Sequence, residues 1–414
     1  MAASALLPSR EPVAYGVPPP TVTTRLYYDD PTLLVFDATV LACEPQAPGF
    51  RVALDRSAFY PTSGGQAHDV GELRAAGQAV PVTDVVTEND VVWHVAAAPL
   101  DVGSRVTGEV DGPRRRDFRQ QHSGQHVLSA SFDHLFDART ESVHLGVDAC
   151  TLDLHREMSA DECRAAEEHA NVVVWDDRAV TIRYIDAADL ASEPRLRRAT
   201  GRTGRIRLVD VEGHDLSACG GTHVRRTGEI GIIAIRGVER FRGGSRVTFL
   251  CGRRALASYR SLRNGMDDVA RLLSVAADDA AVAVGRLRDE VKQEQRKARD
   301  LAERLTAIEV EALATRIGPS GVLVAHLPDA DAQALRQAAS RLVSTGGRAV
   351  ALIGGPSPHA LVIARSVDRL DVDAGGLVRH VCAAHGGKGG GRADLAQAGG
   401  VDVSVEDLRD VLGW

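Results

Sequence analysis

The feature that most constrains the fold is a long segment of helical pattern in the second half of the chain. Between about Arg260 and Ile317 the sequence holds no proline, and glycine is absent after Gly285. Apolar residues then recur at intervals that alternate between three and four, with Glu294 as one polar interruption. The apolar positions are Val284, Leu287, Val291, Ala298, Leu301, Leu305, Ile308 and Ala312. This rhythm predicts a helical, coiled-coil-like stalk over 257–317, formed either by helices that pack within one chain or by two chains that dimerise.

The sequence on either side of this stalk predicts a multidomain α+β protein. Residues 1–23 are rich in proline and lack periodicity, which predicts a flexible tail. Short β-rich runs separated by glycine and proline over 24–113 predict a small β-barrel. Alternating helices and strands over 114–256 predict an α+β domain, with a capping box of Ser159 and Glu162 at the start of one helix. The pattern of 318–414 predicts a compact C-terminal α/β module.

Length and composition exclude several classes of protein. The chain has 414 residues, of which 44% are hydrophobic and 25% charged, as in an ordinary soluble protein of two to four domains. No run approaches the ~18 consecutive apolar residues of a membrane span, so we expect no membrane association. Six cysteines without a CxxC pair argue against a disulfide scaffold. The start of the chain lacks an apolar signal core, which favours a cytoplasmic location.

Two short motifs predict a metal site in the α+β domain. His122 and His126 are four residues apart on a predicted helix, so both imidazoles lie on one face. Cys219 and His223 repeat this interval in a glycine-rich turn. Three imidazoles and one thiolate make a ligand set typical of Zn2+, and we expect one ion per chain. Four protein ligands usually mark a structural zinc, so the sequence leaves open whether this one is catalytic.

Arginines flank the two motifs, although the whole chain carries a net charge of −7. Such local clusters on an acidic chain predict contacts with nucleic-acid phosphates. Aromatic residues make up only 4% of the chain, so base stacking is not expected. The candidate phosphate-binding residues in this region are Arg114, Arg115, Arg116, Arg195, Arg197, Arg198, Arg202 and Arg205.

Three motifs in this order resemble a known family. His122 to His126 followed by CGGTHV is similar to the editing domain of alanyl-tRNA synthetases and their free-standing homologues. SAFYPTSGGQ, which contains Gly64, Gly65 and Gln66, resembles the glycine-rich motif of the preceding β-domain. GGKGGGRADLAQAGG, with Lys388 and Arg392, resembles the signature of the C-terminal DHHA1 domain, except that Ala393 replaces an expected proline. Only about 113 residues precede the editing motifs, so the resemblance is to a long-form AlaX-type protein.

The resemblance implies both an activity and the residues that carry it. His122, His126, Cys219 and His223 would bind zinc, and Thr140 would sense the substrate hydroxyl. Lys388 and Arg392 would bind tRNA. The activity would be hydrolysis of the ester in Ser-tRNA(Ala), and by extension Gly-tRNA(Ala), because an alanine pocket cannot strongly exclude either amino acid. Gly220 and Gly221 are candidate oxyanion donors, or they only permit the turn that aims the ligands.

Other functions compete with this one. One is a deacylase of related specificity, such as one for Ser-tRNA(Thr). Another is a zinc-stabilised tRNA-binding protein without catalysis. A phosphoesterase is not expected, because the paired aspartates of a DHH catalytic domain are absent. A homodimer could form through the stalk or the C-terminal module.

Overall fold

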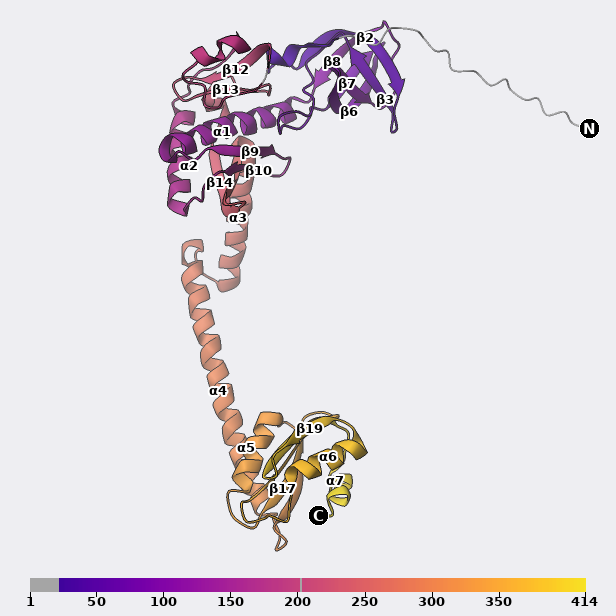
Figure 1. Ribbon diagram of the computed structural model, residues 1–414, viewed down its shortest axis with the longest axis vertical. Helices are drawn as coiled ribbons and strands as arrows, with labels where there is room; N and C mark the ends of the chain where they lie inside the picture. The colour runs from indigo at the N-terminus through magenta and orange to yellow at the C-terminus, as the bar shows by residue number, and fades with distance from the viewer. Residues whose placement is uncertain (1–21, 202) are drawn as a thin grey trace, which may run out of the picture. The chain divides into compact units, whose positions relative to one another are not determined.

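The computed structural model describes residues 22–201 and 203–414 (Figure 1). Most of the predicted tail and Arg202 lie outside this range. The described chain divides into two compact units, one ending at Gly265 and the other running from Met266 to Trp414. We describe each unit by itself.

The first unit begins with a closed β-barrel. Its strands are β2 (Val35–Pro45), β3 (Phe50–Leu54), β5 (Gly71–Ala75), β6 (Gln78–Glu88), β7 (Val91–Ala96) and β8 (Arg105–Val110), arranged in the order β2-β3-β7-β6-β5-β8. Neighbouring strands are antiparallel, and alternate residues such as Phe36, Ala38 and Val40 fill the interior. Two short strands, β1 (Thr24–Arg25) and β4 (Arg56–Ser57), and the helix η1 (Leu26–Tyr28) lie beside it. The barrel predicted from the short β-rich runs is confirmed.

The α+β part of this unit is built around helix α1 (Gly112–Phe136). Asp111 caps its start by accepting a hydrogen bond from the amide of Arg114, and Asp137 ends it in the left-handed conformation. Figure 1 shows α1 between two sheets. One sheet has the order β14-β15-β10-β9 and the other β11-β12-β13. The buried side of α1 contributes Val127, Leu128 and Phe132 to the core.

The remaining elements of the first unit complete these sheets. Ser159 and Glu162 form the predicted capping box at the start of α2. The bounds are β9 (Thr140–Leu145), β10 (Cys150–Leu154), α2 (Ala160–Trp175), β11 (Val180–Asp186), η2 (Ala187–Ser192), β12 (Arg205–Val211), β13 (Asp215–Ala218), η3 (Thr227–Ile230), β14 (Ile233–Phe241) and β15 (Gly244–Cys251).

The segment predicted as a stalk is divided between two helices. Helix α3 (Gly252–Leu273) ends before Ser274, which has a positive φ of 55°. After a short turn, η4 (Ala277–Asp279), helix α4 (Ala280–Ala314) continues for 35 residues, or about 50 Å. The end of α4 belongs to the C-terminal module, because Val310 and Leu313 are buried in that module's core.

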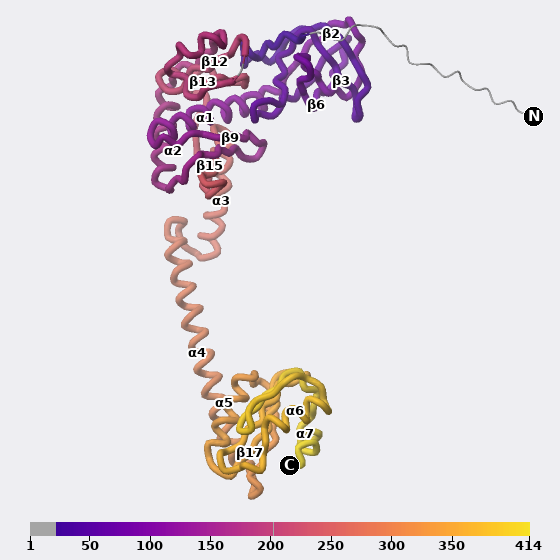
Figure 2. The backbone as a smooth tube through the Cα atoms, in the orientation of Figure 1, coloured from indigo at the N-terminus to yellow at the C-terminus, as the bar shows by residue number. Residues whose placement is uncertain are grey.

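The C-terminal module is a five-stranded sheet with a core on each face. Its strand order is β16-β17-β18-β20-β19, and Figure 2 shows α5 and α6 on opposite sides of it. Val350 and Leu352 face the core beside α5, whereas Ala351 and Ile353 face the core beside α6 and α7. The bounds are β16 (Val322–Leu327), α5 (Ala332–Leu342), β17 (Ala349–Gly354), β18 (His359–Arg365), α6 (Ala374–His385), β19 (Lys388–Gly391), β20 (Leu395–Val401) and α7 (Val405–Leu412).

Candidate metal centre

The four predicted ligands meet in the first unit. His122 and His126 project from one face of α1, and Cys219 and His223 lie in the loop that follows β13. One ligand atom from each residue lies within 4.8 Å of the others. The Cys219 sulfur is 3.3 Å from Nε2 of His122 and 3.3 Å from Nε2 of His223. This separation allows a single metal ion to contact all four residues.

The second nitrogen of each histidine has its own partner. Nδ1 of His122 is 2.8 Å from Oε1 of Gln66, and Nδ1 of His126 is 2.9 Å from Oδ2 of Asp215. Nδ1 of His223 is 3.1 Å from Oγ of Ser123. Such contacts fix the ring orientation and leave every Nε2 free for a metal. The residues therefore fit a tetrahedral ion of the zinc type.

Gln66 brings the barrel into the metal centre. Its amide nitrogen donates to Oγ1 of Thr222, and its Oε1 also accepts from the Thr222 backbone amide at 3.2 Å. Next to it, the carbonyl of Gly65 accepts a hydrogen bond from the amide of Leu145 in β9. The glycine-rich motif therefore contacts both the neighbouring sheet and the loop that carries Cys219 and His223, which we call the metal loop. Sequence reasoning singled out Gln66 as part of a motif but missed this role.

Asp215 is a second residue that sequence reasoning missed. It is buried and accepts hydrogen bonds from His126, from Nε of Arg197 at 2.6 Å and from Ser217. Burial alone would raise the pKa of Asp215, but its bonds to His126 and Arg197 lower the pKa below its usual value. The same pair has the reverse effect on His126. Burial opposes protonation there, yet the hydrogen bond to Asp215 raises the pKa of His126 to about 9.

Cys219 and His223 are poised in the forms that a metal requires. Burial disfavours the Cys219 thiolate, but the imidazoles of His122 and His223 lower the pKa of this thiol well below its ordinary value. Burial, followed by the effect of His122, lowers the pKa of His223 to about 3, so this imidazole is neutral at pH 7. A thiolate and a neutral imidazole are the ligand forms that bind zinc.

The two glycines of the metal loop have different surroundings. A side-chain carbon on Gly221 would overlap the ring of His122, so this position requires glycine. The amide of Gly221 is directed at the Cys219 sulfur, at 3.4 Å. This contact favours the interpretation that Gly221 shapes the turn. Both glycines line the adjoining cavity, and Gly220 stays the candidate oxyanion donor.

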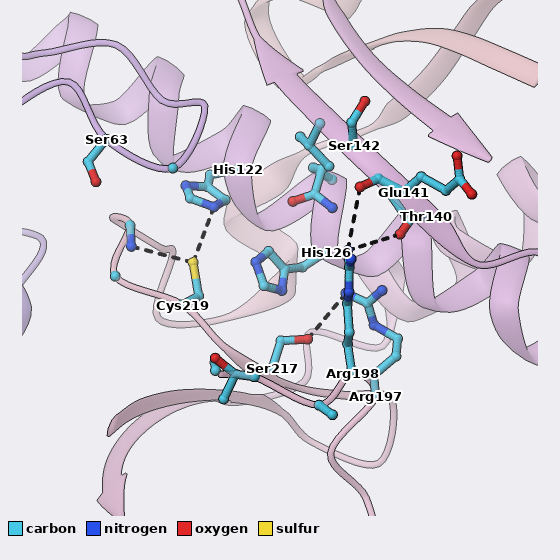
Figure 3. Close-up of a pocket in the computed structure, with 18 of the residues that line it drawn as sticks. Ser63, His122, His126, Thr140, Glu141, Ser142, Arg197, Arg198, Ser217 and Cys219 are labelled. Atoms are coloured by element: carbon cyan, nitrogen blue, oxygen red, sulfur yellow. Dashed lines mark hydrogen bonds between the residues drawn. The ribbon is translucent and has the colours of Figure 1, made fainter. Parts of the chain in front are cut away.

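A cavity of about 480 Å3 opens beside the cluster and is bordered by His122, His126 and Cys219 (Figure 3). Thr140 lies across the pocket from Cys219, as Figure 3 shows. The hydroxyl of Thr140 donates to Oγ of Ser129 at 2.9 Å, and the amide nitrogen of Gln125 donates to the same oxygen at 2.8 Å. The Thr140 oxygen keeps its lone pairs available to accept a further hydrogen bond.

The predicted phosphate-binding arginines separate into two groups. Arg115 is only 1% exposed and forms a buried ion pair with Asp69, so its proposed contact with tRNA is a wrong prediction. Arg197 also has a partner inside the protein, because it forms an ion pair with Asp215. Arg195 pairs with Asp210 at the surface, and Arg114 donates to the carbonyl of His68. Local clustering in the sequence did not reveal these partners, which come from distant segments.

The remaining basic candidates lie nearer to solvent. Arg116 is exposed, and Arg198 borders the metal cavity and donates to the carbonyl of Thr140 at 3.3 Å. Arg205 stacks over the ring of Tyr184, with Cζ 4.4 Å from the ring centroid. In the C-terminal module, Lys388 begins the edge strand β19, and Arg392 pairs with Asp394.

Three protein-family models match parts of this chain and indicate its class. The model of the threonyl and alanyl tRNA synthetase second additional domain matches residues 206–247, which include Cys219 and His223. The DHHA1 domain model matches 320–413. The class II (A) tRNA synthetase model matches 29–114, the region of the barrel.

Individual relatives narrow this class. Alanine–tRNA ligase from Halorubrum lacusprofundi is 33% identical over 398 residues, which is 93% of this chain and 43% of the ligase. The Archaeoglobus fulgidus ligase is 34% identical over 406 residues, or 94% of this chain and 44% of the ligase. The C-Ala domain of Aquifex aeolicus alanyl-tRNA synthetase is 27% identical, with a TM-score of 0.21, over 23% of this chain and 88% of that domain.

The chain thus belongs to the group of proteins related to alanyl-tRNA synthetases that carry the second additional domain and a DHHA1 domain. The resemblance drawn from the sequence motifs is confirmed, and the matches are consistent with an AlaX-type protein. The chain spans less than half the length of these curated relatives. Within the described residues, no helix is both long and apolar enough to cross a membrane.

Proposed function

We propose that this protein is a zinc-dependent deacylase that hydrolyses the ester of Ser-tRNA(Ala), and also that of Gly-tRNA(Ala). The observation that carries this proposal is the opening of the four-ligand cluster onto a cavity that also contains Thr140. A purely structural zinc is normally enclosed by its ligands. Here three of the four ligands border a space of about 480 Å3.

Selectivity for serine would come from the hydroxyl pair on the far side of the cavity. Because Thr140 donates to Ser129, its oxygen can accept a hydrogen bond from a substrate hydroxyl. Alanine would leave that oxygen without a partner, which disfavours the correctly charged tRNA. Glycine is small enough to enter but gains nothing from the pair, so we expect it to be the poorer substrate.

The ester itself would be held between the metal loop and Arg198. Bound Zn2+ supplies positive charge that polarises the ester carbonyl or a water molecule. The amide of Gly220 can donate to the oxygen that becomes negative during attack, because this residue faces the cavity. Arg198, which borders the same cavity, adds a cation near the ribose end of the substrate.

The discriminating experiment is a deacylation assay on four substrates. Purified protein is incubated with Ser-tRNA(Ala), Gly-tRNA(Ala), Ala-tRNA(Ala) and Ser-tRNA(Thr). We expect hydrolysis of the first, slower hydrolysis of the second and little of the third. Preference for Ser-tRNA(Thr) would replace this proposal with a deacylase of that specificity. The matching domain model covers both threonyl and alanyl tRNA synthetases, so this alternative has to be tested. Binding without hydrolysis would indicate a non-catalytic tRNA-binding protein.

Metal dependence has its own test. Replacing His126 or Cys219 by alanine should remove bound zinc, measured by elemental analysis, and abolish hydrolysis. Cys163→Ala is a matched control, because that buried cysteine lies on α2 outside the cluster. Full activity in a zinc-free His126→Ala, Cys219→Ala double variant would end the metal hypothesis.

A further inference from the structure

A second hollow adjoins the metal cavity and is not used by the proposed chemistry. It measures about 410 Å3 and is bordered by the segment from Val22 to Arg25, by Tyr28 and Asp29, by Asp90 and by Tyr184 and Arg205 of the β11–β12 hairpin. Tyr28 borders both spaces. On the metal side, its hydroxyl would lie 3.5 Å from a side-chain carbon placed on Gly220. A ligand in this hollow would therefore be separated from the metal loop by one tyrosine ring.

The far wall of the hollow is a tyrosine held in a fixed orientation. The hydroxyl of Tyr184 donates to Oδ1 of Asp29 at 3.1 Å, which ties the hairpin to the N-terminal segment. The guanidinium of Arg205 lies over its ring, with Cζ at 4.4 Å from the centroid. Arg205 is exposed, and no carboxylate within the described residues pairs with it. An aromatic ring and an exposed guanidinium plane are surfaces on which nucleobases stack.

A buried cation lies beneath the same region. Arg207 is 5% exposed, and its hydrogen bonds go only to carbonyls, those of Tyr28, Cys219 and Gly221. One of its terminal nitrogens is buried without a partner among the described residues. Its Cζ is 5.5 Å from the Tyr28 ring centroid. A buried charge without a counter-ion is costly, so an anion bound nearby would compensate it.

Two arginines and two aspartates line the hollow, and the buried Arg207 adds one positive charge beside it. The sum of these charges weakly favours an anionic ligand. Asp90 is neutralised by Arg25, which also donates to the hydroxyl of Tyr28. Asp29 is the other carboxylate; it accepts the hydrogen bond from Tyr184, and Arg205 and the buried Arg207 both lie near that tyrosine. Attraction by charge alone is therefore weak, and stacking on Tyr184 has to supply most of the affinity. This combination suits a short single-stranded stretch of nucleic acid better than a duplex.

We propose that this hollow, the tail groove, holds the unpaired nucleotides that precede the terminal ribose of the tRNA acceptor strand. Their bases stack on Tyr184 and Arg205, and the chain then passes Tyr28 so that the aminoacyl ester enters the metal cavity. The inference rests on the proposed function for the identity of the RNA. It also revises the expectation, drawn from the low aromatic content, that stacking plays no part.

Binding of uncharged RNA tests the tail groove without any hydrolysis. The probes are a fluorescent acceptor-stem hairpin with an unpaired 3′ ACCA tail and the same hairpin with a blunt end. Wild-type protein should bind the tailed hairpin about tenfold more tightly, the effect of roughly one stacked base. Tyr184→Ala and Arg205→Ala should reduce this preference, and Tyr184→Phe, which keeps the ring, should retain most of it. Tyr259→Ala is the control, because that tyrosine is 61% exposed on α3.

A kinetic measurement separates binding from damage to the metal site. Tyr184→Ala should raise KM for the seryl-hairpin about tenfold, leave kcat within twofold and leave hydrolysis of seryl-adenosine unchanged, because that substrate lacks the upstream nucleotides. Zinc content checks that the variant is folded, and Arg205→Ala serves in its place if Tyr184→Ala loses zinc.

The outcomes distinguish this inference from the proposed function. Equal affinity of wild-type protein for tailed and blunt hairpins, or an undiminished preference in both variants, overturns the tail groove even if deacylation is observed. A tail preference that depends on Tyr184, in a protein that hydrolyses none of the four substrates, supports the groove and removes the proposed function.

Discussion

At the scale of single residues, the metal centre depends on partners that lie far away in the sequence. Gln66 comes from the barrel, 56 positions before His122, yet its Oε1 is 2.8 Å from the ring nitrogen of that ligand. Asp215 holds His126 in the same way, with its Oδ2 2.9 Å from Nδ1 of that ligand. Residues of this kind tune metal affinity without touching the metal.

The contribution of Gln66 can be measured directly. Gln66→Leu keeps approximately the same volume but removes the acceptor for His122, so zinc affinity should fall about 10- to 100-fold. Competition with a chromophoric chelator measures the change. Gln78→Leu, an exposed position at the start of β6 in the same barrel, should bind zinc like the wild-type protein. Unchanged affinity in Gln66→Leu would show that the hydrogen bond does not orient the ligand.

Thr140 gives a prediction about discrimination. Thr140→Val keeps the shape of the side chain but removes the oxygen that would accept the serine hydroxyl. Hydrolysis of Ser-tRNA(Ala) relative to Gly-tRNA(Ala) should fall by about 1–3 kcal/mol of transition-state stabilisation, the scale of one unpaired polar group. Thr181→Val, at an exposed site on β11, is the control. A wild-type ratio of the two rates in Thr140→Val would exclude Thr140 as the sensor.

At the scale of secondary-structure elements, strand β7 contains a buried histidine that makes the barrel sensitive to acid. His94 is fully buried, with its ring nitrogens 2.7 Å from Oγ of Ser57 and 3.0 Å from the carbonyl of Val52. Burial lowers the pKa of His94 from 6.5 to about 4. The unfolded chain therefore binds the proton more readily than the folded barrel between these two pH values, and stability falls as the pH decreases through this window.

The size of this effect follows from the shift. On acidification from pH 7.5 to pH 5, His94 should cost the barrel about 2 kcal/mol of unfolding free energy. His94→Gln should be less stable at pH 7.5 but should lose this component of the pH dependence. Urea unfolding followed by the fluorescence of Trp93, with Trp175 and Trp414 replaced by phenylalanine, reports on β7. Parallel pH profiles for the two proteins would contradict the assignment.

At the scale of the whole molecule, the division into two units shows where the chain can be truncated without breaking a hydrophobic core. A truncation at Gly318 would expose Val310 and Leu313, which pack in the core of the C-terminal module. The boundary after Gly265 separates the two compact units instead. Apolar residues of α4 such as Leu301, Leu305 and Ile308 are more than half exposed in the single chain. A coiled-coil dimer through this seam stays a prediction, which light scattering would test.

The role of the second unit can be tested with the cut at this boundary. If Lys388 and Arg392 grip tRNA away from the acceptor end, removal of residues 266–414 should raise KM for whole tRNA far more than for a short acceptor-stem hairpin. The value of kcat should change little, because the metal centre lies entirely in the first unit. Equal losses on both substrates, together with a change from dimer to monomer, would favour a role in dimerisation only.

The sequence by itself determined the features that depend on local spacing. The interval between His122 and His126 places both on one face of a helix, and Ser159 with Glu162 caps α2. Alternation within short runs predicted the barrel, and three ordered motifs predicted the family. Each of these inferences involves residues that are neighbours in the chain, so backbone geometry alone fixes their relation.

Only the tertiary structure decided which polar groups find partners. Arg115 and Arg205 are equivalent in the sequence, as members of basic clusters, but Asp69 neutralises the first and a tyrosine ring supports the second. Likewise, Tyr28 and Tyr184 are 156 positions apart and border one groove. The energy of a charge or an aromatic ring depends on what surrounds it in space, and segments distant in the chain supply those surroundings.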